Sequence, residues 1–310
     1  MARDYGPRPF LGHDWYKAHA LGNDYLVFEE SAGWRAAPAA AARVCHRHEG
    51  VGGDGIVVLL EFPRGRAATG YALRMFNPDG SEFERSGNGL RVLAAYLHRR
   101  GRVGDEPFEV SSGGESMRVQ VHSHTAAGSY DVEVEMGRAR IGPDAVGLDV
   151  RALDPDGRLA HPLTGPVALV PVGIGNPHAV LFADALAVEF APATLERLGP
   201  GVATHPALAH GANVQLARAD PPAALDILIW ERGVGPTTAS GTSACATAAA
   251  AVATGRLEPG KIKVRMPGGS VHVRVSRELD VVLRGPVQEV GTGRLGEGFA
   301  RTLLAVQGES

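Results

Sequence analysis

Two stretches rich in small residues decide the fold: SGNGLRVLAAYLHRR at 86–100 and SGTSACATAAAAVATGR at 240–256. Each begins with a serine, continues with glycine and other small residues, and then becomes a helix-forming run. A serine that precedes a helix can accept a hydrogen bond from a backbone N–H of the first turn. The two stretches therefore predict two helices of similar construction, each capped by a serine.

These stretches belong to a larger repeat. Asn23 in LGND precedes Ser86 by 63 positions, and Asn176 in IGNP precedes Ser240 by 64. Two motifs that recur in the same order at nearly the same spacing indicate an internal duplication. We predict two like-folded domains at 14–130 and 131–285, a Gly- and Pro-rich leader at 1–13, and a C-terminal segment, 286–310, that can return to the first domain.

Strand-like runs are frequent along the chain, and helical runs are few. GIVVLLEF near 55, LDILIW near 225 and VHVRV at 271–275 are apolar or alternate with period 2, as strands do. Only PATLERLG at 192–199 adds a third clear helical pattern. This mixture predicts an α+β fold.

Composition excludes several classes of protein. Hydrophobic residues make up 44% and charged residues 21%, which excludes a chain that is mainly disordered. A net charge of −3 gives no electrostatic footprint for nucleic acid or a membrane surface. The two cysteines exclude a disulfide scaffold, and the N-terminal stretch has no apolar core of a secretory signal. We expect a cytoplasmic protein with a small-molecule partner and leave open whether it forms a homodimer.

The two helix starts predict anion sites. First-turn N–H groups have no partner inside a helix, and they point outward with the positive end of its dipole. If the two halves are related by a pseudo-twofold axis, both starts converge on one interdomain cleft that holds a carboxylate. The alternative is that both serines only cap buried helices.

A second pair of residues stands nine positions before the serines. Asn77 precedes Ser86, and Glu231 precedes Ser240, with Arg232 next to it. An arginine can pair with a carboxylate in a bidentate fashion, and a glutamate can bind an ammonium group. Together they would bind the two charges of an amino-acid group, although an exposed Glu–Arg pair on a loop is the alternative.

In this combination the sequence resembles the diaminopimelate epimerase family. The stretches that carry the resemblance follow the family order from about residue 15 to 290: HALGNDYLVF (19–28), HRHEGVGGDGI (46–56), FNPDGSEFERSGNGLR (76–91), GNPHAVLF (175–182), GANVQ (211–215) and ERGVGPTTASGTSACA (231–246). The resemblance implies two domains of one fold, each with strands wrapped around a central helix, and an active site between them. It also implies an isomerase of lysine biosynthesis that uses neither pyridoxal phosphate nor another cofactor and no metal. One base would remove the α-proton, and a second acid would reprotonate the opposite face.

The resemblance also assigns residues. The substrate-binding side chains would be Asn23, Asn77, Asn176, Asn213, Glu231 and Arg232. The distal amino-acid group would be held by Asn77, Asn213, Glu231 and Arg232. The reacting carboxylate would be held by the backbone amides of Gly87, Asn88, Gly241 and Thr242. The two catalytic positions are those of Ser86 and Ser240.

Here the chain departs from the family, which has a cysteine at both catalytic positions. A thiol has a pKa of about 8.5, and a helix N-terminus lowers it. A serine hydroxyl is a much weaker acid and needs a separate base. His19 and His178 are the nearest histidines by analogy of position, and we expect Cys45 to be a core residue and Cys245 to lie inside the helix.

Three interpretations of the serines remain. The chain is a divergent natural member, including one with isomerase or dehydratase chemistry on the same scaffold, or an engineered Cys→Ser variant, or a protein that binds an amino acid without turnover. Pro236 and Ser243 also depart from the family pattern, which favours natural divergence.

Two other motifs are set aside. GVGGDG at 50–55 matches a dinucleotide-binding pattern, but a strand rather than a helix should follow it. HRH at 46–48 and HSH at 122–124 lack a third metal ligand nearby in the sequence, so we interpret them as surface histidines.

Overall fold

The structure is a computed structural model that describes residues 13–30, 37–60, 70–83, 85–161 and 164–306. Residues 1–12, which make up nearly all of the predicted leader, lie outside the described residues. The chain divides into two units: unit 1 comprises residues 1–134 and 285–310, and unit 2 comprises residues 135–284. Two strands, β8 (Ser129–Arg138) and β17 (Asp280–Arg294), contribute residues to both units.

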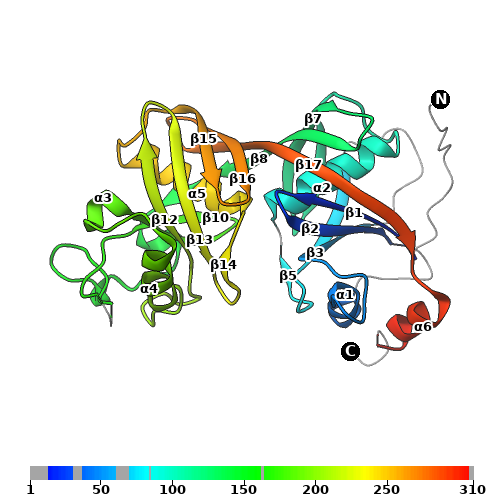
Figure 1. The fold of residues 1–310 in the computed structure, drawn as a ribbon, viewed down its shortest axis with the longest axis horizontal. Coiled ribbons are helices and arrows are strands. Elements are labelled where there is room, and N and C mark those ends of the chain that lie inside the picture. The colour runs from blue at the N-terminus through cyan, green and yellow to red at the C-terminus, as the bar shows by residue number, and fades with distance from the viewer. Residues whose placement is uncertain (1–12, 31–36, 61–69, 84, 162–163, 307–310) are drawn as a thin grey trace. The chain divides into compact units, whose positions relative to one another are not determined.

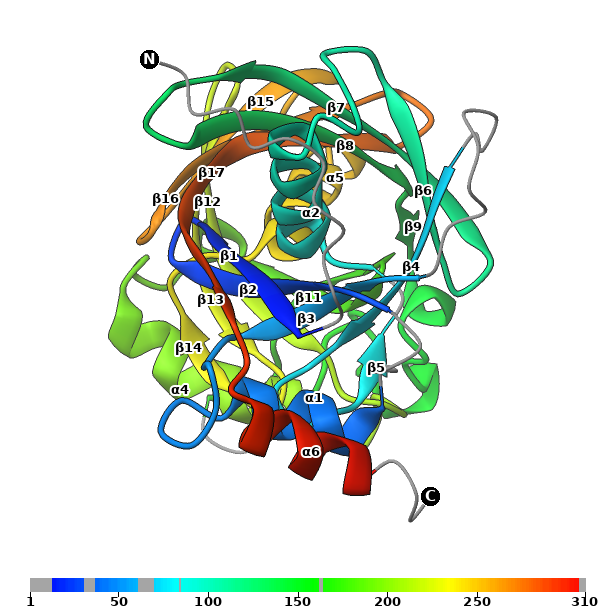
Figure 2. The ribbon, with the colours of Figure 1, turned by 90° about the vertical axis from the view of Figure 1, so that its right-hand side faces the viewer.

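Unit 1 is a sheet closed around one helix (Figures 1 and 2). Its elements besides β8 and β17 are β1 (Asp14–Ala20), β2 (Asn23–Glu29), α1 (Pro38–Cys45), β3 (Gly55–Leu59), β4 (Gly70–Phe76), β5 (Glu82–Phe83), α2 (Gly87–Arg99), β6 (Phe108–Ser112), β7 (Glu115–His124) and α6 (Glu297–Val306). Hydrogen-bonded neighbours follow the order β17, β1, β2, β3, β4, β6, β7, β8 and back to β17. Figure 2 shows α2 inside this ring, and α2 contacts β1, β2, β3 and β7.

The central position of α2 follows from its sequence. Every residue from Gly87 to Leu97 is buried, so the helix has no solvated face. A helix that is buried all round belongs in a core rather than on a surface. Outside the ring, α1 packs against α6, and both cover a second apolar cluster that includes Val44, Leu26 and Leu303 (Figure 2).

Unit 2 repeats this arrangement around α5 (Gly241–Ala253) (Figure 1). Its other elements are β9 (Arg140–Ile141), two short 3-10 turns (Pro143–Ala145 and Val150–Ala152), β10 (Val170–Ile174), β11 (Asn176–Phe182), α3 (Ala183–Leu186), α4 (Pro192–Ala203), β12 (Asn213–Asp220), β13 (Ala224–Glu231), β14 (Gly235–Thr237), β15 (Gly260–Met266) and β16 (Gly269–Val275). The strands pair in the order β9, β10, β11, β12, β13, β15, β16, β17, and β17 pairs with β8, which leads into β9. Helix α5 contacts β10, β11, β12, β13, β15 and β16.

Strand directions match between the units. The pair β2–β3 is parallel, as is β11–β12, and the pair β4–β6 is parallel, as is β13–β15. The hairpins β1–β2, β6–β7, β10–β11 and β15–β16 are antiparallel. Helices α1 and α4 occupy the same place in the chain order, as do α2 and α5. The predicted α+β fold, with two like-folded halves around central helices, is confirmed.

The predicted helices are confirmed with small shifts of their bounds. The helical runs within 86–100 and 240–256 form α2 and α5, and the run at 192–199 forms α4. Helices α1 and α6, which have 8 and 10 residues, were not predicted. No helix among the described residues is long and apolar enough to span a membrane.

Candidate functional site

The start of α2 places Ser86 at its N-cap. The Ser86 hydroxyl accepts a hydrogen bond from the Gly89 N–H at 3.0 Å and donates one to the Tyr25 hydroxyl at 3.1 Å. The carbonyl of Ser86 accepts from the Leu90 N–H at 2.9 Å, which begins the helix. The N–H groups of Gly87 and Asn88 come earlier in the first turn, where a helix offers them no acceptor.

The start of α5 has the same construction. Ser240 is the N-cap, and its hydroxyl accepts from the Ser243 N–H at 3.4 Å. The same hydroxyl lies 3.4 Å from the hydroxyl of Thr242, and Ser240 is only 8% exposed. The N–H groups of Gly241 and Thr242 correspond to those of Gly87 and Asn88. The prediction that a serine caps each of the two helices is confirmed. The capping geometry leaves first-turn amides unused by the helix in each unit.

In unit 1 a chain of amides fixes the side chain of Asn88. The Asn88 amide donates to Asn23 Oδ1 at 2.8 Å. The buried guanidinium of Arg91 donates to Asn88 Oδ1 at 2.5 Å and to the carbonyl of Gly87 at 3.1 Å. Two of the predicted site residues, Asn23 and Asn88, are therefore in contact. Arg91, which sequence reasoning missed, holds the first turn of α2.

A group of ion pairs holds Asp54, which contacts the side chain of Asn23. The Asn23 amide donates to Asp54 Oδ2 at 3.2 Å. Arg47 bridges Asp54 and Asp24 at 2.6 and 2.7 Å, and Lys17 pairs with Asp24 at 2.8 Å. Burial raises the pKa of Asp24, but hydrogen bonds from Arg47 and Lys17 outweigh it and hold that pKa well below its usual range. Burial raises the pKa of Asp54. Sequence reasoning missed this cluster, because its members are spread over residues 17–54.

The ring of Tyr25 fills the space beneath Ser86. A Cβ atom on Gly55 would lie 2.5 Å from Tyr25 Cε1, and one on Gly89 would lie 3.2 Å from the same atom. Both glycines therefore leave room for the ring, which carries its hydroxyl to Ser86. The sequence contains both glycines, but it does not show that they make room for the Tyr25 ring.

In unit 2 a polar cluster lies behind Ser240. The Gln215 amide donates to Ser243 Oγ at 3.0 Å and lies 3.1 Å from His178 Nδ1. All three side chains are fully buried. Burial is the largest influence on His178 and lowers its pKa to about 4, so the imidazole is neutral near pH 7. His178 thus supports the start of α5 through Gln215 and Ser243 and makes no direct hydrogen bond to Ser240.

The predicted distal-group residues of unit 2 lie at the ends of β12 and β13. Asn213 Oδ1 accepts from the Arg232 N–H at 2.9 Å, so these two residues are in contact. The Arg232 guanidinium is exposed and donates to the carbonyl of His210. Among the described residues no carboxylate pairs with Arg232, which leaves its charge available to a ligand. Glu231 is half-buried at the end of β13, and Asn176 is half-buried at the start of β11.

Asn77 belongs to a tight turn in unit 1. Its amide donates to Ser81 Oγ at 2.9 Å, and its N–H donates to the Ser81 carbonyl at 2.8 Å. Asn77 is half-buried and directly follows β4, and its counterpart Glu231 is half-buried and ends β13 in unit 2. The spacing of nine residues before each serine therefore corresponds to equivalent turns.

The remaining sequence expectations concern histidines, cysteines and the glycine-rich run. His19 Nδ1 accepts from the Gly22 N–H at 3.2 Å, which closes its own turn. Cys45 and Cys245 are both buried and neither forms a disulfide, and burial raises the pKa of Cys45 to about 12. Strand β3 follows GVGGDG, as predicted, so no helix start is present there for a dinucleotide.

Sequence comparison now identifies the family. The profile described as diaminopimelate epimerase matches residues 15–142 and 170–290. The chain belongs to the diaminopimelate epimerase family. The diaminopimelate epimerase of Desulfitobacterium hafniense is 34% identical over 290 residues, covering 90% of this chain and 96% of that protein. That of Desulforudis audaxviator is 36% identical over 295 residues, covering 91% and 98%.

Solved structures agree with this membership at the level of fold. A probable proline racemase from Agrobacterium radiobacter K84 has a TM-score of 0.66 at 15% identity, covering 92% of this chain and 93% of that one. A phenazine biosynthesis protein of the PhzF family from Bacillus anthracis has a TM-score of 0.63 at 15% identity, covering 91% and 98%. As a member of the diaminopimelate epimerase family, the chain is an isomerase of the amino-acid epimerase type.

Proposed function

We propose that this epimerase inverts an α-carbon of a diaminopimelate-type substrate without a cofactor, as a step of lysine biosynthesis. The observation that carries the proposal is the matched pair of helix starts, each with a serine N-cap and two first-turn amides that the helix does not use. Backbone amides at a helix start stabilise the negative charge of a carboxylate. The same amides would stabilise the charge that develops when the α-proton leaves.

In this proposal Ser86 and Ser240 occupy the two acid/base positions. One hydroxyl would exchange a proton on one face of the α-carbon, and the other would exchange one on the opposite face. The exposed guanidinium of Arg232, with Glu231 beside it, would bind the second amino-acid group. Asn23, Asn77, Asn176 and Asn213 would complete the polar contacts to the substrate.

A second candidate is a protein that binds such an amino acid without turnover. The observation in its favour is the nature of the groups that each serine hydroxyl contacts within its own unit. Ser86 contacts the Tyr25 hydroxyl and an amide, and Ser240 contacts the Thr242 hydroxyl and an amide. None of these groups is a base at neutral pH, and an unassisted serine is a poor proton acceptor.

Hydrogen–deuterium exchange at the α-carbon separates the two candidates. The protein is incubated in heavy water with each diaminopimelate stereoisomer, and the α-proton signal is followed by NMR while binding is measured by calorimetry. Saturable loss of the α-proton with formation of the other stereoisomer supports the epimerase. Binding without exchange supports the second candidate, and absence of binding shows that the substrate class is wrong.

The control for this experiment is the double variant Ser86→Ala with Ser240→Ala. It should keep the first-turn amides and lose the proton-transferring hydroxyls. Exchange that continues at the unaltered rate in this variant contradicts the assignment of the serines. Circular dichroism checks the fold, since loss of one N-cap costs about 1 kcal/mol.

A further inference from the structure

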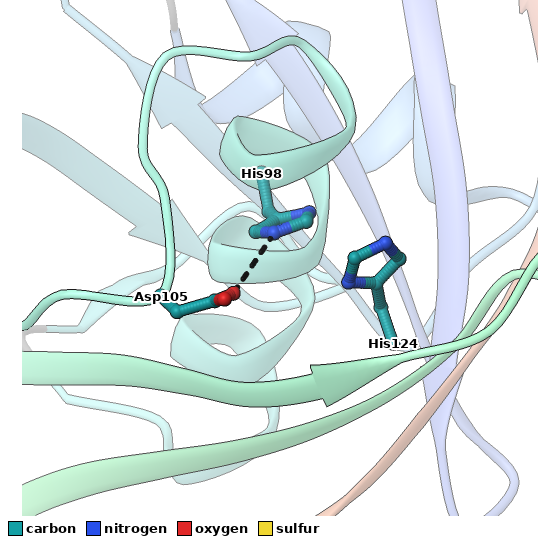
Figure 3. Close-up of side chains that lie close together, drawn as sticks. All are labelled: His98, Asp105 and His124. Carbon is teal, nitrogen blue, oxygen red and sulfur yellow. Dashed lines mark ion pairs between the residues drawn. The ribbon is translucent and has the colours of Figure 1, made fainter.

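Three side chains from separate parts of unit 1 converge at the far end of α2. His98 lies in the last turn of α2, Asp105 lies in the connection that follows, and His124 ends β7 (Figure 3). Their ligand atoms, two imidazole nitrogens and a carboxylate oxygen, all lie within 4.8 Å of one another. Sequence reasoning found no third ligand near HSH because His98 and Asp105 are distant in the chain.

Neighbouring contacts hold the two imidazoles close together. The ring centroids of His98 and His124 are 4.4 Å apart, and Tyr130 stacks on His124 at 6.1 Å with an interplanar angle of 25°. Asp105 Oδ1 lies 3.4 Å from His98 Nε2, as the dashed line in Figure 3 shows. Two imidazoles and a carboxylate thus face one point from three elements.

We propose that His98, Asp105 and His124 form a binding site for a divalent transition metal, with Zn²⁺ the best match. Imidazole nitrogen and carboxylate oxygen are ordinary zinc ligands at about 2.0–2.2 Å. Around a tetrahedral ion such ligands stand about 3.3 Å apart. The present spacing of up to 4.8 Å would have to shorten by about 1.5 Å at most. The side chain of Asp105 is 74% exposed, so little packing opposes such a movement. Mg²⁺ and Ca²⁺ are disfavoured, because they prefer oxygen ligands.

This site is separate from the candidate active site. His98 is twelve residues on from Ser86 along α2, which is about 18 Å at 1.5 Å per residue. Three protein ligands would leave one position of a tetrahedral ion for water. A bound ion would join the end of α2, the connection after it and the end of β7. It would stabilise unit 1, because a ligand that binds only the folded state shifts the unfolding equilibrium.

Calorimetric titration of the metal-free full-length protein with ZnCl₂ tests the proposal. We expect one site, with binding weakened more than 100-fold in His98→Ala and in His124→Ala. Loss of a direct ligand should exceed the ~10–100-fold effect of residues that only orient ligands. Asp105→Asn should also weaken binding. Titration with Co²⁺ provides an independent readout, since tetrahedral coordination by these ligands gives a visible absorption band that both histidine variants should lose.

The matched control is His122→Ala. His122 lies on the same strand and also faces a carboxylate, Glu133, at 3.4 Å, but the described residues place no second imidazole beside that pair. This variant should bind Zn²⁺ like the unaltered protein. Equal losses in His122→Ala and His124→Ala, or no binding at millimolar Zn²⁺, overturn the proposal. Thermal unfolding without metal checks the fold of both variants, since the His98 ring also packs against His124 and Tyr130.

Discussion

The same three positions beneath the serine differ between the two units. In unit 1 the first two positions are the third residues of β2 and β3, Tyr25 and Val57. The third position is Gly89, three residues after the N-cap of α2. The equivalent positions of unit 2 are His178, Gln215 and Ser243, since Tyr25 pairs with Gly55 in one unit and His178 pairs with Asn213 in the other. One unit fills the space with a large ring, and the other fills it with a buried polar cluster.

This difference shows how one fold supports two chemically different helix starts. In unit 1 the Tyr25 ring reaches Ser86 directly and needs glycine at 55 and 89 to fit. In unit 2 the smaller imidazole does not bond to Ser240, and Gln215 and Ser243 occupy the intervening space. The duplicated backbone therefore fixes where the serines stand, while the side chains beneath them set their surroundings.

The largest expected effect comes from restoring thiols to both helix starts. The double change Ser86→Cys with Ser240→Cys should raise the rate of diaminopimelate epimerisation by at least about 100-fold, because one positioned acid or base contributes about 10²–10⁴-fold. A helix N-terminus also favours the thiolate. Stereoisomer formation measured by chromatography checks the rate.

The single variants sharpen this prediction. Each should change the rate little, since two groups must act on opposite faces and their effects need not multiply. A double variant that binds diaminopimelate and stays inactive would show that the site carries other chemistry. An ordinary enzymatic rate in the unaltered protein would show that an activated serine is present.

Acid should weaken unit 2 before unit 1. The pKa of His178 is about 4 in the folded protein and about 6.5 when unfolded, so the unfolded state binds more protons between these values. Stability is therefore lost as pH falls through this window, by about 2–3 kcal/mol between pH 7 and pH 4.5. The low pKa of Asp24 keeps its ion pairs with Lys17 and Arg47 in unit 1 intact at that pH.

Urea unfolding at the two pH values measures this loss. With Trp15 and Trp34 replaced by Phe, Trp230 fluorescence reports unit 2. The variant His178→Gln should show a loss that is smaller by about 2–3 kcal/mol, whereas His122→Gln should behave like the unaltered protein. An unchanged pH dependence in His178→Gln would mean that the buried imidazole is not responsible.

The second carboxylate of the ligand should interact with unit 2 rather than with unit 1. Unit 2 has Arg232 where the equivalent turn of unit 1 has Pro78. We expect Arg232→Ala to weaken binding of diaminopimelate by about 1.5–3 kcal/mol and binding of lysine, which lacks the second carboxylate, much less. Calorimetry with both ligands checks this difference. Arg218→Ala, which removes an arginine already paired with Asp226, is the control, and equal losses for both ligands would contradict the distal-site assignment.

The smallest effect tests the fit of the Tyr25 ring. The change Gly55→Ala should destabilise unit 1 by about 1–3 kcal/mol, because the new Cβ would lie 2.5 Å from the ring. Gly53→Ala is the control, since its Cβ would meet its nearest neighbours at 3.5 Å. Urea unfolding followed by Trp15 fluorescence measures both. Similar stabilities of the two variants would show that the ring can move aside.

The sequence predicted the fold well because the fold depends on local signals. Serine N-caps, small-residue helices and period-2 strands are all readable within short windows, and the repeat of Asn23 and Ser86 as Asn176 and Ser240 revealed the duplication. The surroundings of the serines were not predictable in this way. Tyr25, Gln215 and Arg91 act through contacts between distant segments, and neither a tyrosine nor a glutamine in a strand indicates which hydroxyl it will meet.

Closure of the unit 1 ring by β17 has a consequence during synthesis on the ribosome. Unit 2 is a continuous segment, whereas unit 1 combines the first 134 residues with residues 285–310. Unit 1, most of which is translated first, therefore cannot close its ring of strands until β17 has been translated. Until then the edges of β1 and β8 lack their partner, and unpaired strand edges promote association between chains. A nascent chain stalled before residue 285 should thus depend on chaperones for its N-terminal half, while unit 2 already has all of its strands.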